Sequence, residues 1–71
     1  MGNRIVLVNT TANHRKFWSV QVVGRIAVCE WGRINTWVQS KTFKFASTEE
    51  ARGFALHKAE SKLARGYRIA A

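Results

Sequence analysis

Residues 30–35 combine side chains suited to binding an anionic ligand that contains a ring. Trp31 supplies a large aromatic plane, Gly32 a conformationally free backbone and Arg33 a permanent positive charge. An aromatic plane can stack on a base or a sugar, and a planar guanidinium can donate paired hydrogen bonds to a phosphate. The alternative is structural: Trp31 fills a core, and Arg33 is simply solvated in a turn.

Basic residues dominate the chain, which favours a polyanionic partner such as nucleic acid. The 71 residues include 12 Lys and Arg against 4 Asp and Glu, giving a formal net charge of +8. The excess lies mainly before Ser47, where the basic residues face a single acid, Glu30. Arg15 and Lys16 are consecutive, so at least one of them should reach solvent. The alternative is that the charge serves solubility alone.

Residues for other chemistry are scarce. His14 and His57 have no nucleophile at a suitable spacing, acids are too few for paired-carboxylate catalysis, and no glycine-rich phosphate loop is present. Cys29 is alone, so neither an internal disulfide nor a zinc site is expected. The sequence therefore predicts a protein that is not an enzyme and uses no metal, cofactor or small-molecule substrate.

The length and hydropathy pattern predict one domain over residues 1–71, with its core at about 4–68. The apolar run at 5–8 is too short for a signal peptide or a membrane span. We expect no membrane partner and a cytoplasmic location, associated with the nucleoid if the protein binds DNA.

Four strands and one helix must position the candidate residues. Apolar and alternating patterns predict strands over 4–9, 17–23, 25–31 and 37–45, separated by a loop at 10–14, a tight turn at Gly24 and a turn over 32–36. In that last turn Gly32 is expected to use its freedom at positive φ, and Asn35 to tolerate a left-handed conformation. Trp18 and Trp37 are expected in the core.

A helix is predicted from Ser47 to Gly66. Ser47 with a glutamate three residues later is typical of a capping box, and Gly66 is suited to closing the helix. Alanines 51, 55 and 59 and Leu63 form an i, i+4 row that should let the helix pack closely on a sheet. Residues 67–71 are a short tail that can add a final bridge. The expected fold is α+β: an antiparallel sheet of about four strands, followed by a C-terminal helix on one face.

Several blocks of the sequence, in order, resemble the WGR domain family. They are Lys16-Phe17-Trp18, Trp31-Gly32-Arg33-Ile34, Gln39-Ser40, Phe45-Ala46-Ser47 with Glu49-Glu50-Ala51, and Lys62 to Gly66-Tyr67. The family includes domains of DNA-dependent poly(ADP-ribose) polymerases and small bacterial proteins. The resemblance covers about residues 4 to 68. Asn35 and Val38 stand where the family usually has glycine.

The resemblance implies a small sheet with a helix on one side, and a role at DNA breaks. It implies that the signature tryptophan, here Trp31, packs on the terminal nucleotide near a 5′ end and that Arg33 contacts DNA or a neighbouring domain. It adds Arg15, Lys16 and, less directly, Tyr67 as DNA-binding candidates.

The sequence thus predicts a stand-alone module that binds DNA ends or nicks through phosphates, without sequence specificity because it has no recognition helix. Two alternatives stay open. Trp31 and Arg33 can dock a partner protein in DNA repair, or the uncovered sheet face can bind single strands or RNA with Trp37 and Phe43 as stacking surfaces.

Overall fold

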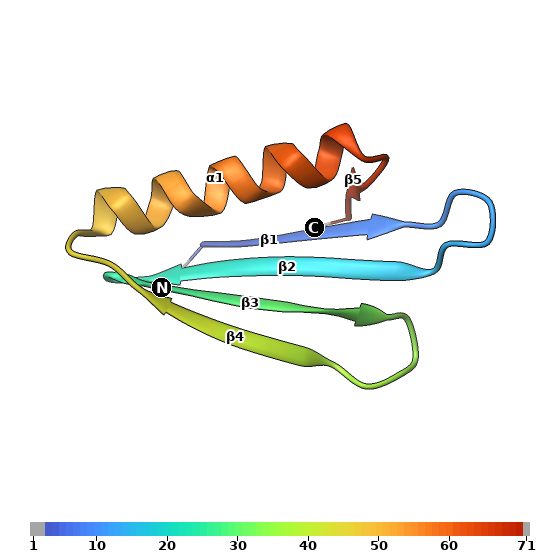
Figure 1. Cartoon of the computed structure of the whole chain (residues 1–71), viewed down its shortest axis with the longest axis horizontal. Helices are drawn as coiled ribbons and strands as arrows, with labels where there is room; N and C mark the ends of the chain where they lie inside the picture. Colours follow the sequence, from blue (N-terminus) through green and yellow to red (C-terminus); the bar gives the residue numbers. More distant parts are fainter. Residues whose placement is uncertain (1–2, 71) are drawn as a thin grey trace.

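The computed structural model describes residues 3–70, which form one antiparallel sheet and one helix (Figure 1). The elements in chain order are β1 (Asn3–Asn9), β2 (Lys16–Val23), β3 (Ile26–Arg33), β4 (Gln39–Lys44), α1 (Thr48–Ala64) and β5 (Arg68–Ile69). The strand order is β4-β3-β2-β1-β5, and all neighbouring pairs are antiparallel. The predicted α+β fold is confirmed, and the tail adds β5 as a short fifth strand.

The register of the strands defines a sheet face that the helix covers. Gly24 closes the β2–β3 turn at φ +60, as predicted. Leu7 faces Trp18, Trp18 faces Trp31, and Trp31 faces Gln39 across the neighbouring strands. Facing residues of antiparallel strands project to the same side, so these four side chains share one face.

The hydrophobic core lies between this face and α1. Its buried members are Leu7, Trp18, Val20, Ala27 and Cys29 from the sheet and Ala55 and Ala59 from the helix. Trp18 is a core residue as expected, and burying a large apolar side chain of this kind contributes about 1.5–3 kcal/mol. The small helical residues allow the close approach of helix and sheet that the alanine row predicts.

The alanine row ends one turn earlier than expected. Ala51, Ala55 and Ala59 are buried, but Leu63 is 41% exposed. A four-residue step advances about 40° beyond one full helical turn, so a strict i, i+4 row rotates away from the sheet. In the last turn the half-buried residue is Lys62, which becomes important below.

Ser47 begins the helix as the N-cap. Its hydroxyl accepts a hydrogen bond from the Glu50 amide at 3.1 Å, and the Glu50 carboxylate accepts one from the Ala46 amide at 3.1 Å. The reciprocal bond of this capping box therefore reaches one residue farther back than in the usual pattern. Two side chains at the start of the helix therefore accept hydrogen bonds from backbone amides of the same segment.

Gly66 ends the helix, also as predicted. It has φ +99, and its amide donates to the Leu63 carbonyl at 3.1 Å, while the Tyr67 amide donates to the Lys62 carbonyl at 3.2 Å. This pair of bonds is the Schellman arrangement. It turns the chain back, so that Tyr67 lies beside the last helical turn and β5 pairs with β1.

The opposite face of the sheet is uncovered by any helix among residues 3–70 and is only partly buried. Ser19 is an exception at 1% exposure, because Arg4 lies across it. Arg4 donates to the Ser19 hydroxyl at 3.4 Å and to the Glu30 carboxylate at 2.9 Å. This exposed ion pair is worth at most about 1 kcal/mol. Within the described chain, α1 is neither long nor apolar enough to span a membrane.

Candidate nucleic-acid-binding site

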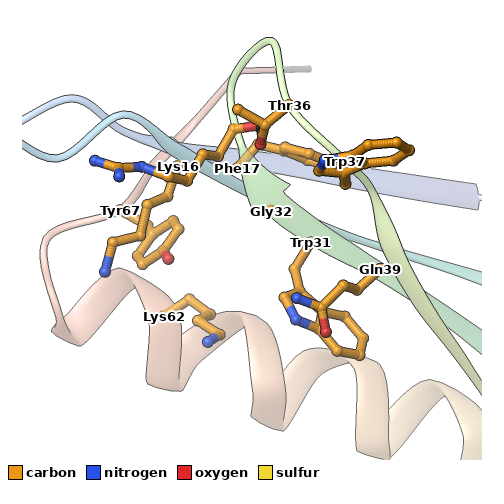
Figure 2. A pocket seen from close by; sticks show the side chains of 10 residues that line it. Lys16, Phe17, Trp31, Gly32, Thr36, Trp37, Gln39, Lys62 and Tyr67 are labelled. Carbon is orange, nitrogen blue, oxygen red and sulfur yellow. Dashed lines mark hydrogen bonds between the residues drawn. The ribbon is translucent and has the colours of Figure 1, made fainter.

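The candidate residues converge at one end of the molecule. The β1–β2 loop, the β3–β4 loop and the C-terminal end of α1 all lie there (Figure 1). Between them is an open hollow of about 310 Å³. The residues that line it come from β2, β3, the β3–β4 loop, β4, α1 and the segment that follows α1, and are Lys16, Phe17, Trp31, Gly32, Arg33, Thr36, Trp37, Gln39, Lys62 and Tyr67. Figure 2 shows Lys62 rising from the helix into the space between Tyr67 and Trp31.

Trp31 is both part of the core and part of the hollow. It is half-buried, faces Trp18 across β2 and β3, and packs against the core cluster. It also lines the hollow beside Gln39 (Figure 2). The two interpretations of Trp31 are therefore compatible, because packing against Trp18 holds one part of the indole while another part remains accessible.

Arg33 ends β3 and begins the turn that shapes the rim. Its carbonyl accepts hydrogen bonds from the Thr36 amide at 3.2 Å and the Thr36 hydroxyl at 2.8 Å. Asn35 takes φ +68, the left-handed conformation predicted for it. The Ile34 amide donates to the Arg15 carbonyl at 2.7 Å, which ties this turn to the β1–β2 loop. The exposed Arg33 side chain is thus carried by a backbone that these hydrogen bonds hold in place.

Gly32 is required for a reason other than the expected positive φ. It belongs to β3 and is not among the residues with positive φ. A Cβ at this position would lie 2.5 Å from the Trp37 carbonyl oxygen and 3.7 Å from the Phe17 ring. Glycine therefore allows the β3–β4 loop to fold back onto the strand.

Trp37 is the largest departure from the sequence-based expectations. It was expected in the core within a strand over residues 37–45, but β4 begins at Gln39 and Trp37 is 90% exposed. The close return of the loop onto Gly32 directs the Trp37 carbonyl inward and leaves the indole at the rim of the hollow. Phe43 was expected as a stacking surface on the open face of the sheet. Its ring instead lies 4.7 Å from the Phe54 ring of α1, so it packs on the face that the helix covers.

The hollow is completed by two lysines and a tyrosine, Lys16, Lys62 and Tyr67. Burial and the nearby positive charges of Arg65, Lys58 and Lys16 lower the pKa of Lys62 below its ordinary value, against a small opposing effect of Cys29. The Lys62 ammonium lies 5.5 Å from the centre of the Tyr67 ring. The positive charges that converge here repel one another, so the site favours the binding of an anion.

Four of the five predicted binding residues are brought together, and one is not. Trp31, Arg33, Lys16 and Tyr67 line the hollow. Arg15 is exposed in the adjoining loop but does not line it, and its observed contribution is the backbone carbonyl that accepts from Ile34.

Sequence reasoning missed Lys62 and the exposure of Trp37. A signal for Lys62 exists, because Phe54, Lys58 and Lys62 form an i, i+4 series beside the alanine row and so share the sheet-facing side of α1. Trp37 carries no comparable signal, since alternation with Gln39 and Lys41 continues through it.

A second, smaller hollow of about 220 Å³ adjoins the first. It is lined by Trp18, Cys29, Trp31, Phe43, Phe54, Lys58 and Lys62. Burial raises the pKa of the Cys29 thiol above its ordinary value, and the charges of Lys58 and Lys62 partly oppose that effect. Among residues 3–70 no carboxylate lines either hollow, and no group of three His, Cys, Asp or Glu is arranged to hold a metal ion.

The comparison with known families agrees with the fold. The model of the WGR domain family matches residues 2–71. The chain belongs to the WGR family. A crystal structure of a Bacteroides fragilis protein superposes on this WGR domain with a TM-score of 0.90 at 28% sequence identity. The match covers 97% of this chain but only 20% of the other, so the WGR domain spans about a fifth of that protein's length. No curated protein matches significantly.

Proposed function

We propose that this WGR domain acts by binding rather than catalysis, and that it holds duplex DNA near a break or a 5′ end. In this proposal Arg33, Lys16 and Lys62 contact phosphates, and Trp31 stacks on the terminal nucleotide. Such a role implies a cytoplasmic, nucleoid-associated protein. A terminal nucleotide presents an uncovered ring next to a phosphate, which is the combination that the hollow can bind.

The observation that best supports the proposal is the set of side chains that line the hollow. Aromatic side chains and cations surround the same space, and no carboxylate among the described residues lines it. Stacking of a base on an aromatic side chain is worth roughly 1–3 kcal/mol. Because Trp31 is held by the core, little side-chain entropy is lost when a ligand stacks on it.

The geometry favours recognition without sequence specificity. Phosphate contacts position a protein on DNA but carry no direct sequence information. The buried side of α1 is committed to the sheet through Ala51, Ala55 and Ala59, so that side cannot enter a major groove. Specificity for an end would come from the exposed nucleotide alone.

The test compares a closed circular duplex with the same circle carrying one nick with a 5′ phosphate, at one near-physiological salt concentration. We expect tighter binding to the nicked circle. Arg33→Gln should weaken binding to the nick more than Arg25→Gln, because Arg25 lies in the β2–β3 turn and lines neither hollow. Equal affinity for both circles would refute the proposal and leave partner docking as the role of the Trp31 and Arg33 surface.

A further inference from the structure

The two hollows adjoin and share part of their lining, and together they are referred to below as the groove. Both are lined by Trp31 and Lys62, which therefore mark the point where they meet. From there the first hollow leads to Trp37 and Arg33 at the end of the molecule. The second leads along the helix to Phe54 and Lys58. Figure 2 shows Lys62 on the helix side of the shared region and Trp31 on the sheet side.

The groove offers an exposed aromatic ring at one end and cations toward the other. In the second hollow the Lys58 ammonium lies 5.7 Å from the centre of the Phe54 ring. Next to it on β4, the Lys41 ammonium lies 5.1 Å from the centre of the Phe43 ring. At the other end Trp37 is 90% exposed, which is unusual for so large an apolar side chain. On one side of Trp31, therefore, the Trp37 ring is open to solvent, and on the other side the Lys58 ammonium stands over a ring that packs against the core.

This pattern is that of a surface for an unpaired strand. Aromatic platforms that follow a positively charged groove bind single-stranded nucleic acid, because unpaired bases can leave the stack and expose their faces. A fully paired end offers one uncovered base pair, which Trp31 alone would cover. A second aromatic ring, that of Trp37, would not be needed for such an end, whereas a further unpaired nucleotide can stack on it.

We propose that the groove from Trp37 through Trp31 and Lys62 to Lys58 holds a single-stranded extension that continues from the bound DNA end. This inference rests on the proposed function and narrows its substrate class to ends with unpaired nucleotides. Lys58 then contacts a phosphate of the extension and takes no part in contacts with the duplex. The mutual repulsion around Lys62 is relieved when phosphates enter.

The test uses a hairpin duplex with one blunt end, the same hairpin with a short oligothymidine extension on either strand, and a closed circular duplex. One extended hairpin should bind roughly tenfold more tightly than the blunt hairpin, the effect expected for about one stacked base. Lys58→Gln should weaken this preference while leaving blunt-end affinity unchanged, because it removes a phosphate contact of the extension alone. It should also reduce the salt slope for the extended DNA by about 0.7, the value for one phosphate of a single strand.

Arg52→Gln is the matched control, since Arg52 is an exposed basic residue of the same helix that lines neither hollow. It should leave the preference intact. If blunt hairpins bind better than the circle but extensions add nothing, the groove proposal is overturned while end binding stands. If the blunt hairpin, both extended hairpins and the circle bind alike, both proposals fail. If Arg52→Gln weakens the preference as much as Lys58→Gln does, the extension does not lie in this groove.

Discussion

Gly32 shows how a single missing side chain shapes the binding surface. A Cβ there would lie 2.5 Å from the Trp37 carbonyl, so Gly32→Ala must displace the β3–β4 turn. We expect a loss of about 1–3 kcal/mol in the free energy of unfolding, as for other overpacked sites. Gly53→Ala is the control, because its Cβ would meet nothing within 4 Å. It should stabilise α1 by about 0.5–1 kcal/mol. Urea denaturation measures both, and equal effects would contradict this explanation of Gly32.

Cys29 gives the protein a predictable alkaline response. Burial raises the pKa of its thiol above 9.0, so the folded state retains the proton that the unfolded state loses. The contribution of the Cys29 thiol to the free energy of unfolding is therefore complete below pH 9.0. It declines as the pH rises from there through the pKa of the thiol in the folded state. Lys62, whose pKa is lowered, acts in the opposite direction.

Comparison with Cys29→Ala isolates the thiol from this opposing effect. The variant should be less stable at neutral pH, because it leaves a small cavity, and its disadvantage should shrink above pH 9.0. The measurement is urea denaturation of both proteins at neutral and alkaline pH. A difference in stability that does not change with pH would show that burial does not perturb this thiol.

At the level of elements, the close contact between α1 and the sheet positions the basic residues of the groove. Ala55 is buried in this contact, so Ala55→Leu should cost about 1–3 kcal/mol and move Lys58 and Lys62 away from the sheet. His57→Leu places the same side chain on the exposed side of the helix and should change stability by no more than about 0.5 kcal/mol. Thermal unfolding distinguishes the two variants, and similar melting temperatures would mean that the interface tolerates extra volume.

Elements governed by local rules were predictable from the sequence. Ser47 and Gly66 mark the helix ends, and Asn35 takes the left-handed conformation, because each depends on hydrogen bonds or sterics within a few residues. Trp37 was not predictable, since its exposure follows from the return of a loop onto Gly32. The helical spacing of Lys62 indicates that it faces the sheet, but its position beside Lys16 and Tyr67 depends on contacts between distant segments.

For the whole molecule, the charge distribution predicts steep salt dependence. The net charge is +8, and cations from the sheet and the helix meet at one end. The logarithm of the binding constant for duplex DNA should fall linearly with the logarithm of salt concentration, with a slope of about −0.9 per phosphate contacted. Lys16→Gln should reduce the slope by about one such unit, and Lys44→Gln, on the open face of β4, should reduce it less. A slope near zero would indicate a partner other than a polyanion.

The most direct test of the central claim measures the ratio of affinities for nicked and closed circular DNA in the wild type and in Trp31→Leu. Leucine keeps apolar volume against the core but removes the aromatic plane. A ratio is used because any loss of folded protein lowers both affinities equally. We predict that the wild type prefers the nick and that Trp31→Leu brings the ratio close to one. An unchanged ratio would contradict the account, because end recognition would then not depend on stacking at Trp31.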